Sequence, residues 1–200
     1  MRFPVMALAL LATLAVIPIS QAHAAQREAI FAGGCFWCME PPYDKLEGVV
    51  STTSGYIGGD SERPTYAQVS SGNTGHAEAV KVVYDDEVIG YDTLLDVFWH
   101  NIDPFAERRQ FCDVGSQYRS ALFPLDQRQR RLAEASKDAV ETRFERDVKT
   151  RIEPKAPFWD AEEYHQNFYQ KNPVRYRFYR AGCGRDDRLE AVWGDDAGKP

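Results

Sequence analysis

Hydrophobic and polar positions follow two periods along this chain, and the two periods alternate. Apolar or alternating runs predict strands at 29–32, 49–56, 78–84, 118–123 and 149–152. Apolar residues spaced three and four apart predict helices over 36–46, 91–101, 126–146 and 162–171. Because strands and helices interleave, we predict an α/β (α+β) domain with two layers.

The first residues have the pattern of an export signal. Arg2 precedes an apolar run over 5–19, and Ala22 and Ala24 form an A-x-A cleavage pattern. An uncleaved membrane anchor is the alternative, but the run is shorter than the roughly 20 residues that a spanning helix needs. We therefore expect residues 1–24 to be removed, which predicts a periplasmic or secreted protein with no stable membrane insertion.

The net charge of the chain bears on which class of molecule it binds. The chain has 24 basic and 30 acidic residues and a net charge of -6, which argues against nucleic acid as the main partner. Residues 25–200 have the length of a single domain, and the tail from about residue 182 is expected to be mobile because it is rich in glycine and charge. Four cysteines in an exported chain also suit a binding or scaffold domain with two structural disulfides.

One cysteine follows a strand and a glycine pair. Residues 33–34 permit a tight turn, so Cys35 is expected at the start of the next helix. Unpaired N–H groups and the helix dipole favour thiolate over thiol there, and the thiolate is the nucleophilic form. Pro41 and Pro42 would disrupt a helix that is already running, so the regular part is expected to begin near them.

The remaining cysteines leave several readings open. Cys35 and Cys38 form a Cys-x-x-Cys pair, which could serve a general dithiol–disulfide oxidoreductase without other groups. Zinc is a poor fit, because Cys112 and Cys183 lie far apart without a second ligand at short spacing. Cys112 is expected to be a small packed side chain. His76 suggests a further alternative, a cysteine–histidine hydrolase.

Five motifs occur in one order along the chain. They are G-C-F-W at Gly34 to Trp37, S-G-Y-x-G-G at Ser54 to Gly59, P-T-Y at Pro64 to Tyr66, S-G-N-T-G-H-A-E-A-V at Ser71 to Val80, and D-x-G-S-Q-Y-R-S at Asp113 to Ser120. With these motifs the sequence resembles the A-type peptide methionine sulfoxide reductases over most of its length after the signal. That resemblance implies reduction of the S epimer of methionine sulfoxide, free or within proteins.

The resemblance also implies a fold and a set of residue roles. The fold is a two-layer α/β sandwich around a mixed sheet, a ferredoxin-like plait. Cys35 would be the nucleophile and Glu78 the proton donor, with Tyr66 and Tyr118 directing their hydroxyls at the sulfoxide oxygen. Asp113 would help to organise water or the incoming groups. These roles suit the chemistry, since a sulfoxide sulfur is electrophilic only when its oxygen is hydrogen-bonded or protonated.

Two aromatic residues and two cysteines complete the expected site. Phe36 and Trp37 suit the S-methyl group of the substrate, because an apolar aromatic wall favours methyl and sulfur over water. A second thiol would condense with the Cys35 sulfenic acid to form a disulfide. Cys183 is slightly favoured over Cys38, because a tail between two glycines can move in without distorting the turn. The resemblance implies recycling by an external thioredoxin-like dithiol, with no bound cofactor and no metal.

Overall fold

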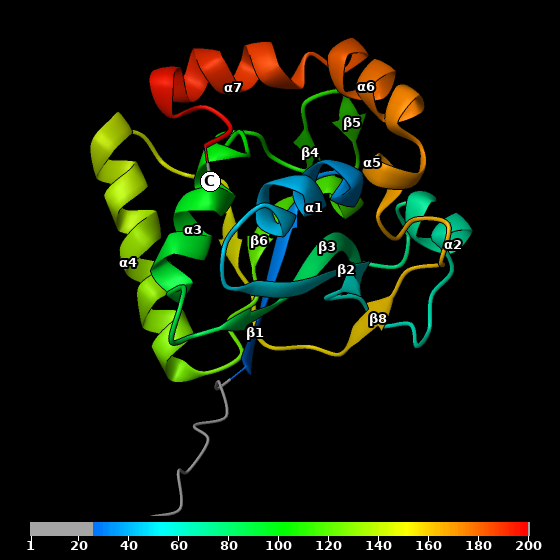
Figure 1. The fold of residues 1–200 in the computed structure, drawn as a ribbon, viewed down its shortest axis with the longest axis horizontal. Coiled ribbons are helices and arrows are strands. Elements are labelled where there is room, and N and C mark those ends of the chain that lie inside the picture. The colour runs from blue at the N-terminus through cyan, green and yellow to red at the C-terminus, as the bar shows by residue number, and fades with distance from the viewer. Residues whose placement is uncertain (1–25, 200) are drawn as a thin grey trace, which may run out of the picture.

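The computed structural model describes residues 26–199, so the expected signal and its cleavage site lie outside the described residues (Figure 1). Six elements in chain order form a ferredoxin-like plait: β1 (Gln26–Gly33), α1 (Phe36–Asp44), β2 (Val49–Ile57), β3 (Ala77–Asp85), α3 (Tyr91–His100) and β6 (Ser120–Leu122). The predicted alternation of strands and helices is confirmed over this part of the chain.

The sheet within the described residues has six strands in the order β7-β6-β1-β3-β2-β8. Its edges are β7 (Arg151–Ile152) and β8 (Phe158–Asp160). Strands β6 and β7 pair in parallel, whereas the other neighbours are antiparallel, so the sheet is mixed as expected. The register places Tyr56 opposite Glu78 at the end of the sheet where β1 leads into α1.

The two faces of the sheet bury different side chains because neighbouring residues of a strand point in opposite directions. Phe31 of β1 stacks on Tyr43 of α1 and on Tyr91 and Phe98 of α3, so these helices cover one face. The adjacent Ile30 belongs to a smaller buried cluster on the opposite face. The larger core therefore fixes α1, with its N-terminus directed at the end of the sheet.

The remaining elements surround this frame. They are α2 (Tyr66–Ser70), β4 (Arg109–Gln110), β5 (Asp113–Val114), α4 (Gln127–Phe144), α5 (Phe168–Lys171), α6 (Pro173–Gly182) and α7 (Arg185–Trp193). Helix α4 packs against α3, where Trp99 Nε1 donates to Ser136 Oγ at 3.0 Å. Figure 1 shows α6 and α7 crossing the end of the molecule beyond α1. Within residues 26–199, every helix is too short or too polar to cross a membrane.

Helix α1 begins earlier than its prolines suggested. It starts at Phe36 and keeps Pro41 and Pro42 inside its second half. Each proline removes one N–H donor, but seven of the nine side chains of this helix are buried. Tertiary packing supplies most of the stability of a short helix, and here it outweighs the lost hydrogen bonds. The expectation that the regular part begins near the prolines was wrong.

Two expectations for the C-terminal part also need correction. The segment from residue 182 is not a mobile tail but forms α7, because Leu189 and Trp193 lie four residues apart and are both buried. Trp193 Nε1 also donates to the carbonyl of Ile102 at 2.9 Å. The helix expected over 162–171 is confined to α5, and the residues before it form turns that bring His165 into the interior.

Candidate functional site

The turn between β1 and α1 positions Cys35 as expected. Gly34 has φ +86, a conformation that favours glycine, and a Cβ there would lie 2.5 Å from Cβ of Gln110. A Cβ on Gly33 would lie 2.6 Å from the Met39 sulfur. Cys35 follows as the N-cap of α1 and is 6% exposed. The glycine pair thus lets the backbone turn tightly and delivers the thiol to the helix N-terminus.

Glu78 meets the same helix N-terminus from β3. Its Oε2 accepts a hydrogen bond of 3.2 Å from the backbone N–H of Phe36, the residue after Cys35. The Glu78 side chain is almost completely buried, and this burial raises its pKa to about 8 despite the hydrogen bond from Phe36. A carboxylic acid that stays protonated at neutral pH therefore lies beside the thiol. The structure brings together the two groups on which the sequence-based hypothesis depends.

The second thiol of the pair also lies in this pocket. Cys38 is 1% exposed, and its backbone N–H donates to the Cys35 carbonyl at 3.0 Å. Burial raises the pKa of Cys35, and a hydrogen bond with Cys38 and the charge of Glu78 raise it further. The hydrogen bond from Cys35 lowers the pKa of Cys38 to about 6, and Arg185 and Arg180 act in the same direction.

This charge distribution differs from the sequence-based expectation. We expected the helix N-terminus to favour thiolate at Cys35, but desolvation of the buried sulfur outweighs that effect. The two shifts have opposite directions, up for Cys35 and down for Cys38, so they favour the negative charge of the reduced pair on Cys38. The helix dipole argument did not account for the burial of this turn.

Three tyrosines lie near the Cys35 thiol and the Glu78 carboxyl. The pKa values of Tyr66 and Tyr118 are raised by burial and then by the nearby charge of Glu78, and each tyrosine also affects the pKa of the other. Tyr179 of α6 was not foreseen. Its Oη donates to Asp113 Oδ2 at 2.5 Å, and burial raises its pKa, with further contributions from its contact with Cys35. Asp113 is therefore connected to Cys35 through one hydroxyl.

The aromatic residues after Cys35 form a packed wall. Trp37 stacks on Phe168 with 3.6 Å between ring centroids and an angle of 6°. The indole Nε1 donates to Nδ1 of His165 at 3.0 Å, and the His165 ring lies 4.9 Å from that of Phe36 and 4.6 Å from that of Tyr66. Burial lowers the pKa of His165 to about 4, so its imidazole is neutral and can accept from the indole.

His76 has a structural role in this fold. Its Nδ1 accepts from the N–H of Gly59 at 3.2 Å, and its Nε2 lies 2.8 Å from the Ser61 carbonyl, to which it donates. Both ring nitrogens are thus occupied by backbone groups of one loop. Neither is free to take a proton from Cys35, so the geometry does not favour the cysteine–histidine hydrolase alternative.

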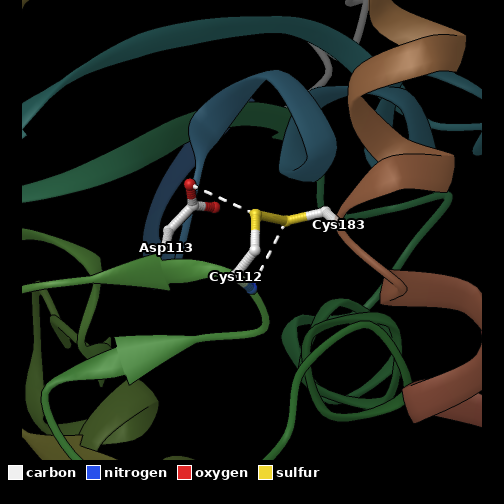
Figure 2. A group of neighbouring side chains, drawn as sticks. All are labelled: Cys112, Asp113 and Cys183. Atoms are coloured by element: carbon white, nitrogen blue, oxygen red, sulfur yellow. Dashed lines mark hydrogen bonds between the residues drawn. A yellow bond between two sulfur atoms is a disulfide. The ribbon is translucent and has the colours of Figure 1, made fainter.

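The other two cysteines are bonded to each other (Figure 2). Cys112 and Cys183 form a disulfide that joins the segment between β4 and β5 to the end of α6. Cys112 is exposed rather than packed, and its N–H donates to the Cys183 sulfur at 3.3 Å. Its own sulfur lies 3.8 Å from Asp113 Oδ1. Cys35 and Cys38 remain unbonded, so the four cysteines do not form two structural disulfides.

Three potential metal-ligand atoms, from Cys112, Asp113 and Cys183, lie within 4.8 Å of one another. Both sulfurs belong to the disulfide shown in Figure 2 and therefore are not thiolate ligands in this state. In this state the group is a disulfide beside a carboxylate.

The structure gathers most residues chosen from the sequence and adds others. It places Cys35, Cys38, Glu78, Tyr66, Tyr118, Asp113, Phe36 and Trp37 around the N-terminus of α1. Cys183 lies in the disulfide instead, linked to the site through Tyr179 and Asp113. Sequence reasoning missed His165, Tyr179 and Arg185. Tyr179 comes from α6, where no helix was predicted. His165 comes from turns where a helix was predicted. The direction of neither side chain could therefore be foreseen.

Comparison with known proteins gives consistent results. The model of the family described as peptide methionine sulfoxide reductase matches residues 27–197. The peptide methionine sulfoxide reductase MsrA of Ligilactobacillus salivarius is 49% identical over 167 residues, which cover 82% of this chain and 96% of that protein.

Two solved structures are also similar. Mxr1 from Saccharomyces cerevisiae in reduced form matches with a TM-score of 0.70 and 32% identity, covering 74% of this chain and 87% of that one. Mxr1 in complex with Trx2 matches with a TM-score of 0.53 and 25% identity, covering 76% and 90% respectively.

Proposed function

This chain belongs to the peptide methionine sulfoxide reductase family, and from that premise we propose that it reduces methionine S-sulfoxide, free or within proteins, with Cys35 as nucleophile and Glu78 as acid. The hydrogen bond from the Phe36 N–H to Glu78 carries this assignment, because it holds a protonated carboxyl within one residue of the thiol. Nucleophile and acid can therefore approach the two ends of one sulfur–oxygen bond.

The reaction can be written with the groups present. Glu78 gives its proton to the sulfoxide oxygen while the Cys35 sulfur attacks the sulfoxide sulfur and its own proton passes to the Cys38 thiolate. The hydroxyl group on the substrate sulfur then transfers to the Cys35 sulfur. A Cys35 sulfur–oxygen bond forms while the substrate sulfur–oxygen bond and the new sulfur–sulfur bond break, so methionine leaves and Cys35 becomes a sulfenic acid. Two electrons have moved from Cys35 to the substrate. The hydrogen bond between the two thiols supports this proton path.

The surrounding side chains have supporting roles. Tyr66 and Tyr118 are neutral and can donate to the sulfoxide oxygen together with Glu78, which stabilises the charge that develops there. Asp113 holds Tyr179 against Cys35. Phe36 and Trp37 present the apolar surface that suits the S-methyl group. One place for methyl and one for oxygen leave only one epimer with its sulfur toward Cys35.

We propose Cys38 as the resolving cysteine, which reverses the order of the two candidates given by the sequence. Cys38 already contacts Cys35, whereas Cys183 is bonded to Cys112. Condensation of the Cys35 sulfenic acid with the Cys38 thiol forms a disulfide and releases one water molecule. Cys183 could replace Cys38 only after the Cys112–Cys183 bond is reduced.

A dithiol protein would then restore the reduced pair. The likeness to Mxr1 in complex with Trx2 supports a thioredoxin-like reductant for this chain. Each turnover consumes one dithiol, which becomes a disulfide as Cys35 and Glu78 regain their protons and Cys38 returns to thiolate. No resident cofactor is required by this sequence of steps.

We also propose that residues 1–24 direct export and are then removed, so that the enzyme works in the periplasm or outside the cell. The apolar run over 5–19 and the A-x-A pattern at Ala22 and Ala24 support this proposal. Mass spectrometry of the protein from its host should find Ala25 as the first residue. Retention of Met1 in the mature protein would contradict it.

Single-turnover chemistry tests the proposed function. Reduced wild type mixed with excess methionine S-sulfoxide and no reductant should yield about one methionine per enzyme, and Cys38→Ser should yield the same amount. Cys35→Ser should yield none. Mass mapping of the wild-type product should show a Cys35–Cys38 disulfide. Equal loss in Cys35→Ser and Cys38→Ser would contradict the order of steps, and a Cys35–Cys183 disulfide would restore the first candidate.

Glu78→Gln distinguishes the sulfoxide reductase from the main alternative. A general dithiol–disulfide oxidoreductase needs only Cys35 and Cys38, so its insulin-type disulfide reduction would survive Glu78→Gln. Sulfoxide reduction should instead collapse in that variant. The buried acid beside Cys35 favours the sulfoxide reductase, since disulfide exchange gives it no role.

A further inference from the structure

A cavity of about 720 Å³ lies at the end of the sheet where β1 leads into α1, and the reaction described above does not use it. Its lining comes from Gly58, Gly75, Arg108, Ser116, Arg119, Arg151, Ile152, Glu153 and Pro154. Three of these residues are arginines and one is a carboxylate, so the lining carries an excess of positive charge. This is unusual on a chain whose net charge is -6.

One arginine is built into the wall of the cavity. Arg119 is nearly buried and pairs with Glu153 through Nε at 2.7 Å and Nη2 at 3.0 Å. Its Nη1 donates to the Ser116 carbonyl at 2.9 Å. The single carboxylate of the lining is therefore already neutralised. The remaining positive charge belongs to the other two arginines.

Arg108 and Arg151 are held at the rim without partners. Both are exposed, and neither has a carboxylate within ion-pair distance among residues 26–199. The backbone of Arg108 has φ +53, an unfavourable conformation for a residue with a side chain, and its carbonyl accepts from the Gly115 N–H at 3.0 Å. Such strain persists where surrounding structure enforces it, often at binding sites. Arginine pairs well with carboxylates because its donors match their geometry.

Several residues that line the cavity are close in sequence to residues of the proposed active site. Arg119 directly follows Tyr118, and Ser116 belongs to the same 3-10 turn as Tyr118. Gly75 precedes Glu78 by three residues and lies just before β3. Consecutive Cα atoms are about 3.8 Å apart, so the Cα atoms of Arg119 and Gly75 lie at most about 4 and 11 Å from those of Tyr118 and Glu78. An extended peptide covers that distance with one to four residues.

We propose that this cavity, through Arg108 and Arg151, binds acidic side chains that flank methionine sulfoxide in oxidised polypeptides. The proposal rests on the proposed function and adds a preference among its protein substrates. Aspartate or glutamate one to four residues from the oxidised methionine would reach the arginines while the sulfoxide lies at Cys35. Free methionine sulfoxide would gain nothing from the cavity.

Peptide kinetics test this proposal with the whole protein. The substrates are short peptides with one central methionine S-sulfoxide that is flanked on each side by two aspartates, two serines or two lysines. Dithiothreitol is the reductant. Exposed ion pairs contribute about 0.5 kcal/mol each. Two such pairs should therefore give the aspartate peptide about a fivefold higher kcat/KM than the serine peptide. The lysine peptide should be slower still, and added salt should reduce the differences.

Matched variants distinguish the cavity from general electrostatics. Arg108→Gln with Arg151→Gln should abolish the preference for the aspartate peptide while leaving kcat/KM for free methionine sulfoxide within twofold. Arg128→Gln with Arg131→Gln removes the same charge from exposed positions of α4 and should leave the preference intact. Absence of an aspartate preference in wild type, or equal loss in both double variants, would overturn the proposal. Failure of wild type to reduce free methionine sulfoxide would instead contradict the proposed function.

Discussion

At the residue scale, two buried thiols share one hydrogen bond, and this sharing determines how Cys35 becomes a nucleophile. Helix dipole reasoning alone assigns the thiolate to Cys35. Burial reverses that order, and Arg185 and Arg180 provide positive charge near Cys38. Cys38 then has two successive roles in our account, as acceptor of the Cys35 proton and as the thiol that closes the disulfide.

Thiolate absorbance in the ultraviolet should reveal this order. Reduced wild type should gain one thiolate with an apparent pKa of about 6, because the hydrogen bond from Cys35 stabilises the ionised Cys38. Cys38→Ser should lose that transition and retain only the raised pKa of Cys35. If the transition near pH 6 persists in Cys38→Ser and disappears in Cys35→Ser, the charge belongs to Cys35.

His165 should act on the substrate through Trp37. His165→Phe leaves the partly buried indole N–H without its acceptor, a loss of about 1 kcal/mol that should raise KM for methionine sulfoxide about fivefold with little change in kcat. His165→Gln keeps an acceptor oxygen and should recover much of the affinity. Steady-state kinetics of the two variants provide the comparison, and equal KM values would exclude a role for the hydrogen bond.

Sequence patterns identified the residues that carry chemistry more completely than those that position them. Cys35, Glu78, Tyr66 and Tyr118 belong to motifs whose spacing is visible in the chain. His165 was missed because the spacing over 162–171 predicted a helix, whereas the residues before α5 form turns, so its contact with Trp37 depends on tertiary folding.

At the element scale, helix α1 carries a buried carboxyl group, in addition to Glu78 of β3, and ionisation of this group lowers the stability of the fold. Glu40 is completely buried, and its Oε1 accepts from the Asn167 N–H at 3.4 Å, while Oε2 has no partner among the described residues. Burial raises its pKa to about 7 from an ordinary value near 4.5. Folded protein therefore binds more protons than unfolded protein between these values, so this group makes stability fall as pH rises through them.

Glu40→Gln should remove that dependence. The variant keeps an oxygen for Asn167 and cannot ionise, so relative to wild type it should gain up to about 3 kcal/mol in free energy of unfolding between about pH 5 and pH 8. Urea denaturation at several pH values measures the difference. A constant difference across this range would contradict the assignment.

The disulfide should stabilise the C-terminal helices. It closes a sequence separation of 71 residues, for which chain entropy predicts about 4 kcal/mol of stability. Cys112→Ser with Cys183→Ser should lose most of this in urea denaturation, as should wild type under reducing conditions. Cys38→Ser serves as control because it breaks no bond, and a loss below about 1 kcal/mol in the double variant would contradict a structural contribution.

Elements with strong periodicity were predicted well, and elements stabilised by distant contacts were not. Strand β2 has an alternating pattern and strand β3 is rich in apolar residues, so each is identified in isolation. Helix α7 has few apolar residues, and its helical form depends on burying Leu189 and Trp193 against segments far away in sequence. Composition alone therefore suggested a mobile tail.

At the scale of the whole molecule, the ferredoxin-like plait was predicted from the family resemblance, whereas strand and helix alternation alone indicated only an α/β or α+β class. The antiparallel pairing of β2 with β3 places Glu78 at the end of the sheet where β1 leads into α1. Nucleophile and acid therefore come from segments 43 residues apart in sequence, Cys35 and Glu78, through the topology of the sheet.

The pH dependence of a single turnover tests the pairing of Cys35 with Glu78 most directly. Quenched-flow measurement of methionine formation by reduced wild type should show a rate that falls above about pH 8, because Glu78 loses the proton that it must donate. Glu78→Gln should be slower by about 10²- to 10⁴-fold and should lack that fall. A variant rate equal to wild type, or the same fall above pH 8 in Glu78→Gln, would contradict the account.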